Sequence, residues 1–343
     1  MIRPKVFLGV SGGIDSFASA LILKNMGYEV IGVHLLMEGK CKEDIPLLSK
    51  RLGIDIIIHD ASKLFQEKVI NNFVNTYIAG GVPSPCVECN NYVKWESLRY
   101  VADNHGGGFI STGHYCRITK IDSLFFVQRG VDNLKDQSYY LWHLGQDILS
   151  RAIFPLGELT KTEVRSFVLQ HGFQELSKRN ESMGLCFMGG KKLREYLLEK
   201  EPSLKDLEGG NILDHNGKVI GQHSGYPFYT LAQKKGLALD VNKCITSVNK
   251  DNNTLLIGCA NDLFTKIIHV KDVYATSKEM LISCLQLTIK VRGIGVNPKG
   301  YATININGTN ATIILQEPAW AVTSGQPVVF YSDDIVLGGG VCY

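Results

Sequence analysis

The chain has 343 residues, of which 45% are hydrophobic and 20% charged. A chain of this length and composition is expected to bury a hydrophobic core and to fold into two or three domains. The composition excludes a disordered chain, and the length excludes a small fold that depends on disulfide bonds. The formal net charge of +3 does not decide whether nucleic acid is a partner, because such binding depends on local basic patches.

Short apolar runs alternate with helical patterns in the first half of the chain. A helix is expected over residues 17–26, and a second one where Phe65, Val69, Phe73 and Tyr77 recur every four residues. The expected strands are 6–10, 30–36, 56–59 and 109–112. This alternation predicts an α/β fold, with a parallel sheet covered by helices on both faces.

The second half of the chain changes from helical to β patterns. Thr160 and Glu163 form a capping box that opens a helix, and Gly172 is placed to close it. From Ile267 onward short strands alternate with turns, and Asn307-Gly308 has the sequence of a hairpin turn, so this tail predicts a small all-β barrel. We therefore expect three domains, at 1–192, 193–265 and 266–343.

A glycine-rich turn, Ser11-Gly12-Gly13-Ile14-Asp15-Ser16, lies between the first expected strand and the first expected helix. Glycines let the backbone turn tightly, and the free N–H groups of a helix N-terminus attract phosphate. The turn is not a Walker A loop, since no Gly-Lys-Ser/Thr follows, and its glycine spacing differs from the dinucleotide fingerprint. We therefore predict a phosphate-binding loop of another kind.

Nine cysteines are spread along the chain, without a signal peptide or a run of 18 apolar residues. We therefore expect a cytoplasmic protein with no membrane partner, in which cysteines are reduced. Cys86 and Cys89 form a Cys-x-x-Cys pair after Pro83-Ser84-Pro85, and their place near a helix start predicts lowered thiol pKa values. No second Cys-x-x-Cys completes a zinc site, and Cys186 lies far away in sequence.

Several separated segments, in order, resemble the tRNA-specific 2-thiouridylases of the MnmA, or TrmU, family, within the PP-loop ATP pyrophosphatase superfamily. They span nearly the whole chain: 9–16, 83–94, 112–115, 135–139, 154–157, 184–189, 221–236, 325–326 and 337–340. The resemblance implies an adenine nucleotide alpha hydrolase-like PP-loop domain (1–192), a small tRNA-contacting domain (193–265) and the β-barrel (266–343). It implies a tRNA-uridine 2-sulfurtransferase that adenylates the C2 oxygen of the wobble uridine, position 34, and replaces it with sulfur.

The resemblance also assigns residues to roles. Cys89 would be the nucleophile and Cys186 the persulfide carrier, with a Cys89–Cys186 disulfide left after transfer. Target-base contacts would come from Ser84, Pro85 and Cys86. ATP, with Mg²⁺, would be bound by Gly9, Val10, Ser11, Gly12, Gly13, Ile14, Asp15, Ser16, Leu35 and Gly113. The tRNA would be contacted by His114, Lys135, Asp136, Gln137, Arg292, Gly293 and Gln326. The partners implied are lysine, glutamate and glutamine tRNAs and a sulfur donor protein, either a cysteine desulfurase or a sulfur carrier.

The sequence departs from the family pattern before the first cysteine. Many members carry an Asp, a candidate acid/base group, where this chain has Cys86, and Arg-Thr where it has Gly81-Val82. Cys86, Cys89 and Cys186 together suggest a second mechanism, in which three thiolates hold an iron–sulfur cluster. Two other functions remain open: a PP-loop enzyme that adenylates a small molecule, and a tRNA-binding protein without catalysis.

Overall fold

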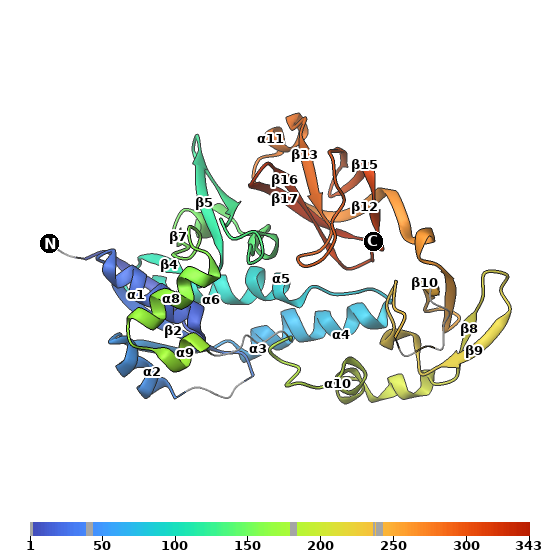
Figure 1. Cartoon of the computed structure of the whole chain (residues 1–343), viewed down its shortest axis with the longest axis horizontal. Coiled ribbons are helices and arrows are strands. Elements are labelled where there is room, and N and C mark those ends of the chain that lie inside the picture. Colours follow the sequence, from blue (N-terminus) through green and yellow to red (C-terminus); the bar gives the residue numbers. More distant parts are fainter. Residues whose placement is uncertain (1–2, 39–43, 179–183, 236, 238–242) are drawn as a thin grey trace.

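The computed structural model describes residues 3–38, 44–178, 184–235, 237 and 243–343. In Figure 1 an α/β part lies at one end, a smaller β part at the other, and the C-terminal β part above the helices between them. Within these residues no helix combines the length and apolar character needed to cross a membrane.

A five-stranded parallel sheet forms the N-terminal part, in the order β3-β2-β1-β4-β7. The strands are β1 (Lys5–Gly9), β2 (Glu29–Leu36), β3 (Ile56–Asp60), β4 (Phe109–Ser111) and β7 (Ala152–Ile153). In the central strand β1, Val6, Phe7 and Leu8 are fully buried, as a parallel strand covered on both faces requires. The four predicted strands and the α/β class are confirmed, while β7 is too short to leave a sequence pattern.

Helices cover both faces of this sheet. Val6 and Leu8 share a core with α1 (Ile14–Asn25) and α2 (Ile45–Leu52), whereas Phe7 points to the other face and packs with α6 (Trp95–Asn104). The predicted capping box opens α8 (Lys161–Gln170), and Gly172 follows its end with a φ of 86°. The remaining helices here are α7 (Gln146–Leu149), α9 (Gln174–Lys178) and the short η3 (Ser138–Leu141).

Two long helical runs each contain a π-helical turn. The first consists of α3 (Ser62–Phe65), η1 (Gln66–Ile70) and α4 (Asn71–Ile78), and it carries the predicted stripe of buried aromatic and aliphatic residues. The second consists of α5 (Pro85–Cys89), η2 (Asn90–Lys94) and α6. Such turns occur frequently at functional sites. Here one of them directly follows the Cys-x-x-Cys pair.

The central part is a four-stranded sheet in the order β10-β11-β8-β9. Its strands are β8 (Gly210–Leu213), β9 (Val219–His223), β10 (Lys243–Asn249) and β11 (Thr254–Cys259). Helices α10 (Leu193–Lys200), η4 (Pro202–Leu207), η5 (Tyr226–Phe228) and η6 (Ala260–Leu263) flank it. The Tyr226 hydroxyl donates a 2.6 Å hydrogen bond to the Ile78 carbonyl, which ties this part to the end of α4.

The C-terminal part is a curled sheet with strands in the order β13-β16-β17-β12-β15-β14. The strands are β12 (Phe264–Ala275), β13 (Leu287–Lys290), β14 (Ala302–Asn307), β15 (Asn310–Trp320), β16 (Pro327–Ser332) and β17 (Ile335–Cys342), with α11 (Lys278–Ser283) after β12. The two ends of this row, β13 and β14, come back into contact. Gly308 has a φ of 63° in the tight turn between β14 and β15, so the predicted hairpin is confirmed.

One hairpin of the N-terminal part belongs to the C-terminal sheet. β5 (Cys116–Ile121) pairs with β6 (Leu124–Arg129), and Gln128 of β6 pairs with Ile335 of β17. The same hydrophobic core contains Phe7 from the parallel sheet and Tyr331 from the barrel. The two parts therefore form one packed unit, an arrangement that the sequence patterns did not predict.

Candidate active site

The phosphate loop is a tight turn at the carboxyl end of β1. Gly12 has a φ of 72°, and Gly13 is the N-cap of α1 in an extended conformation. The Ser16 hydroxyl donates to the Gly13 carbonyl at 3.0 Å, while the Ser11 amide donates to that hydroxyl at 3.3 Å. Residues 9–16 thus place free N–H groups of a helix N-terminus at the edge where open α/β sheets bind ligands.

A lysine from a helix that is distant in sequence forms an ion pair with the carboxylate of this loop. Lys161, at the start of α8, is 8% exposed, and its ammonium lies 2.8 and 2.9 Å from the two carboxylate oxygens of Asp15. The Tyr115 hydroxyl donates to the same carboxylate at 2.8 Å. Sequence reasoning missed Lys161, because 146 residues separate it from Asp15 and a single lysine after a capping box carries no signal of its own.

Residues 112–114 lie between the phosphate loop and the thiols. A Cβ atom on Gly113 would come within 2.9 Å of the Asp15 carbonyl carbon, so the backbone there touches the loop. The His114 ring stacks on Trp95 with centroids 6.3 Å apart, and its Nδ1 lies 2.6 Å from the Thr112 hydroxyl. Leu35, also predicted at the nucleotide, lies near the carboxyl end of the neighbouring strand β2 and packs against the same core.

The Cys-x-x-Cys pair stands on α5, at the same end of the sheet. Ser84 is the N-cap, Pro85 is buried in the first turn, Cys86 is exposed and Cys89 is half-buried. Helix α6, which continues α5, packs on β1, and a Cβ atom on Gly9 would lie 3.5 Å from Leu98. Because crossover helices run antiparallel to the strands, α5 lies beyond their carboxyl ends, beside the phosphate loop.

The loop that carries Cys186 comes to this helix. Phe187 is buried and packs edge-to-face on Phe73, with ring centroids 5.1 Å apart. Cys89 and the two residues flanking Cys186-Phe187, Leu185 and Met188, pack against this same cluster. The helix that carries Cys89 and the segment around Cys186 thus pack against one cluster, and Cys186 acts electrostatically on both Cys86 and Cys89.

The predicted lowering of the thiol pKa values is wrong for this conformation. Burial raises the pKa of Cys89 to about 11 and also raises that of Cys86, although Lys94 acts on both in the opposite direction. Loss of water around a thiolate outweighs the nearby cation and the helix N-terminus.

Two charged residues near the thiols had no predicted role. Glu88 lies between the cysteines in sequence, and burial raises its pKa to about 7 despite the opposing effect of Lys68. Lys94 acts electrostatically on both thiols and on His114, whose pKa burial holds well below its usual value. Both residues lie within the 83–94 segment that resembles the family, and that segment was the only sequence signal for either of them.

The predicted RNA-contacting residues of the first domain face the protein. The Asp136 carboxylate accepts from the Lys290 ammonium at 2.9 Å and from the Ser138 hydroxyl at 3.0 Å, and its side chain is 3% exposed. The Gln137 amide oxygen accepts from the Tyr115 amide at 3.0 Å. His114 is 8% exposed, and Lys135 is half-buried. RNA contacts by these residues remain a prediction.

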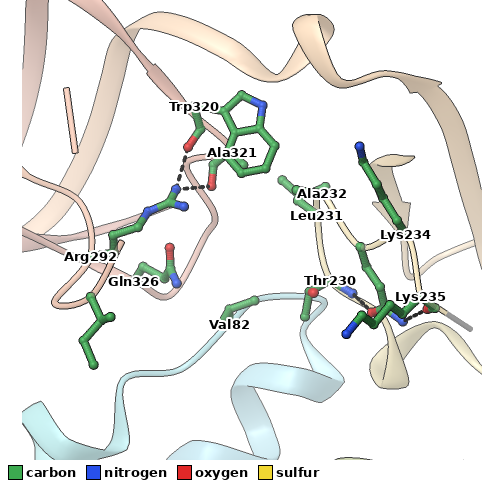
Figure 2. A pocket seen from close by; sticks show the side chains of 12 residues that line it. Val82, Thr230, Leu231, Ala232, Lys234, Lys235, Arg292, Trp320, Ala321 and Gln326 are labelled. Atoms are coloured by element: carbon green, nitrogen blue, oxygen red, sulfur yellow. Dashed lines mark hydrogen bonds between the residues drawn. The ribbon is translucent and has the colours of Figure 1, made fainter. Parts of the chain in front are cut away.

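Two of the three predicted RNA-contacting residues of the barrel, Arg292 and Gln326, line a separate pocket (Figure 2). Arg292 donates to the Trp320 and Ala321 carbonyls at 2.5 and 3.1 Å, and Gln326 lies in the same pocket. A Cβ atom on Gly293 would lie 2.4 Å from the Tyr140 hydroxyl, so only glycine fits there without a shift. Arg292 and Gln326 thus share one pocket, whereas Gly293 packs against Tyr139 and Tyr140 of η3.

The described residues contain no group of three His, Cys, Asp or Glu side chains that could hold a metal ion. Cys86, Cys89 and Cys186 are among these residues, so their arrangement in this conformation does not fit a cluster with three thiolate ligands. The site instead offers an anion-binding loop, a buried lysine and adjacent thiols.

A parallel α/β sheet with a glycine turn at the carboxyl end of its central strand is typical of nucleotide-binding α/β proteins, and here it is packed against a β-barrel. Three family models match: tRNA methyl transferase HUP domain (residues 4–190), tRNA methyl transferase PRC-barrel domain (195–259) and aminomethyltransferase beta-barrel domain (265–342). The chain belongs to the MnmA family, whose curated members are named tRNA-specific 2-thiouridylases.

Three relatives illustrate the likeness over the full length. MnmA 1 of Bacteroides fragilis is 34% identical, covering 98% of this chain and 96% of the relative. MnmA of Cytophaga hutchinsonii is 35% identical over 98% and 97% of the two chains. MnmA of Clostridium beijerinckii is 33% identical over 99% of both.

Proposed function

We propose that the chain is a tRNA-uridine 2-sulfurtransferase that converts the wobble uridine of its tRNA to 2-thiouridine at the expense of ATP. One observation supports this proposal: the helix that carries Cys89 and the segment around Cys186 pack against the same hydrophobic cluster. The name shared by its full-length relatives supports the same reaction.

In the first step, the C2 oxygen of uridine attacks the α-phosphorus of ATP. The oxygen–phosphorus bond forms, pyrophosphate leaves, and the base carries AMP on its C2 oxygen. Residues 9–16 would bind the phosphates through backbone N–H groups, with Leu35 and Gly113 beside the nucleotide. Lys161 would add a buried positive charge as pyrophosphate departs, and Mg²⁺ would arrive with ATP.

In the second step, sulfur replaces the activated oxygen. Cys186 would carry the sulfur as a persulfide, and the Cys89 thiolate would attack its inner sulfur. This forms a Cys89–Cys186 disulfide and releases hydrosulfide, which displaces AMP from C2 and loses its proton. Two external thiols, or one dithiol, then reduce this disulfide by exchange and are themselves oxidised to a disulfide. Because burial raises the pKa of Cys89 to about 11, a proton acceptor would have to remove its proton before the attack.

The chain would find its substrates through two surfaces. Segment 84–86 would meet the target base, while residues 135–137, 292–293, His114 and Gln326 would hold the RNA. The substrates would be the lysine, glutamate and glutamine tRNAs, and a cysteine desulfurase or a sulfur carrier would supply the sulfur. Such a reaction suits a reducing cytoplasm, because Cys89 must return to a thiol after each turnover.

Mass spectrometry of wobble uridines tests the function. Wild-type protein incubated with ATP, a persulfide-generating system and tRNA is expected to form 2-thiouridine, and Cys186→Ser is expected to form none. Cys259→Ser removes another exposed cysteine, far along the chain on β11, and is the matched control. Equal product from wild type and Cys186→Ser would refute the role of Cys186, and no product from wild type would refute the function.

A further inference from the structure

The helix that carries Cys86 and Cys89 changes its winding directly after Cys89. Residues 90–94 form the π-helical turn η2, in which the Trp95 amide donates to the Asn90 carbonyl, five residues earlier. The Asn90 side-chain amide donates to the Cys86 carbonyl at 2.9 Å, so the turn is tied to the thiol helix α5. A π-helical turn is wider than an α-helical turn, and every side chain after its start is therefore rotated about the helix axis.

This rotation decides which side chain lies above the thiols. In an α-helix each residue advances by about 100°, which would place Lys94 about 140° away from Cys89 around the axis. In a turn closed by hydrogen bonds between residues i and i+5, residues five apart lie above one another instead. Lys94 therefore lies on the same face of the helix as Cys89, and Cys86, three residues before Cys89, shares that face.

Lys94 brings a positive charge to this face. It is half-buried, and it acts electrostatically on Cys86, Cys89 and His114. None of the ion pairs in the described part of the chain involves Lys94. Burial holds the pKa of His114 well below its usual value, so the positive charge beside the thiols belongs to the lysine and not to the imidazole.

The other titratable groups that act on the two thiols cannot supply a positive charge. Cys186 acts on both Cys86 and Cys89 and disfavours their thiolates. On η3, burial and then Cys86 raise the pKa of the Tyr140 phenol. Thiols and phenols are either neutral or negative, so none of these groups stabilises a neighbouring thiolate by charge. Lys94 is thus the described cation that opposes the effect of burial on both thiols.

We propose that the π-helical turn holds Lys94 over the thiols as the cation that stabilises first the Cys89 thiolate and then the hydrosulfide released from Cys186. The proposal rests on the proposed function and deepens it, because it adds a residue to the sulfur-transfer step. The Cys89 proton passes to solvent, the thiolate forms a bond to the inner sulfur on Cys186, and the electron pair of the persulfide bond leaves with the hydrosulfide. One negative charge thus moves between two sulfur atoms, and a fixed ammonium beside both stabilises it without rearranging.

Alkylation by iodoacetamide at about pH 8, followed for each cysteine by mass spectrometry, tests the proposal without tRNA or ATP. Loss of a nearby opposite charge raises a pKa by about one unit or more, and the more basic thiolate reacts faster, so Cys89 is expected to react about threefold more slowly in Lys94→Met than in wild type. Lys94→Arg keeps the charge and is expected to recover most of the rate. Lys68→Met is the matched control, because Lys68 of η1 acts on Glu88 of the same thiol helix. Unfolding would expose Cys89 and speed its reaction, so a slower reaction cannot come from a loss of structure.

A single-turnover measurement of the complete reaction gives a second readout. Lys94→Met is expected to slow 2-thiouridine formation at least about tenfold more than it slows pyrophosphate release, whereas a general loss of structure would slow both steps alike. Equal alkylation of Cys89 in wild type and Lys94→Met, or the same loss in Lys68→Met, would overturn the proposal. If wild type forms no 2-thiouridine, the proposed function fails, while slower alkylation in Lys94→Met would still support the action of Lys94 on the thiol.

Discussion

Replacing Lys161 with methionine removes the one cation that the described structure places on the phosphate loop carboxylate. At about 4 Å and an effective dielectric constant near 20, an ion pair is worth roughly 4 kcal/mol before the loss of hydration is counted. The Asp15 side chain is 34% exposed, so solvent screens the pair, and we expect a stability loss of about 1–2 kcal/mol. The protein therefore still folds, and catalysis can be measured.

The larger effect is expected on ATP. A charge-assisted hydrogen bond to a phosphate contributes about 1.5–3 kcal/mol, which corresponds to a rise of roughly 10- to 150-fold in the KM for ATP or an equal fall in kcat/KM. The assay is tRNA-dependent pyrophosphate release at varied ATP, with Lys161→Arg as the conservative variant expected to recover part of the loss.

A second substitution separates direct phosphate binding from simple neutralisation of the loop. If Lys161 only balances the charge of Asp15, then Asp15→Asn in the Lys161→Met background restores ATP use. If Lys161 contacts the departing pyrophosphate, the double variant remains as impaired as Lys161→Met. Full recovery in the double variant would refute a role for Lys161 as the cation that stabilises pyrophosphate.

Two further substitutions test the site from other directions. Burial raises the pKa of Glu88 from 4.5 to about 7, so the stability that its protonated form contributes is present below pH 4.5 and is lost as the pH rises through 7. At pH 8 the free energy of unfolding of Glu88→Gln should therefore exceed that of wild type by up to about 3 kcal/mol, whereas at pH 4.5 it should not. Urea unfolding measures this difference, and Glu208→Gln, at an exposed position, is the control. In Gly113→Ala the new Cβ would lie 2.9–3.0 Å from backbone atoms of the phosphate loop, and we expect the KM for ATP to rise about tenfold. The matched control is Gly221→Ala, whose new Cβ would meet only a side chain at 3.7 Å, and it should leave the KM for ATP unchanged. An unchanged KM for ATP in Gly113→Ala would contradict this reasoning, because the phosphate loop would then accommodate the new Cβ without losing its ability to bind ATP.

Features that local sequence determines were predictable. The sequence of residues 6–26 was sufficient to predict the strand, the phosphate loop and the helix, because Gly12 and Gly13 determine the backbone conformation of the residues next to them. The same holds for the Asn307-Gly308 hairpin and the Thr160 capping box, in which each turn residue sets the backbone within four positions. The direction in which the thiol pKa values shift was not predictable, because desolvation depends on residues that are distant in sequence and pack around the thiols in the fold.

Long-range pairings account for the rest. Asp15 meets Lys161 across 146 residues, and Asp136 meets Lys290 across 154. No sequence periodicity or motif predicts either pairing, because the residues around Lys161 and Lys290 resemble those around any surface lysine. A family pattern can mark such residues as important, yet only the folded chain shows that Asp136 is buried against another domain.

The interlocked core changes how the three domains should be understood. Sequence patterns divide the chain near residues 192 and 265, but Phe7 of the parallel sheet and Tyr331 of the barrel share one core, and β6 completes the barrel sheet. The Asp136–Lys290 ion pair, with side chains only 3% and 17% exposed, crosses the same boundary. Because a buried ion pair is costly to open, the parallel sheet and the barrel hold a fixed relative position. If the barrel holds the RNA as we propose, that rigidity keeps the target base in register with the thiols, since a small misplacement of reacting groups lowers the rate sharply.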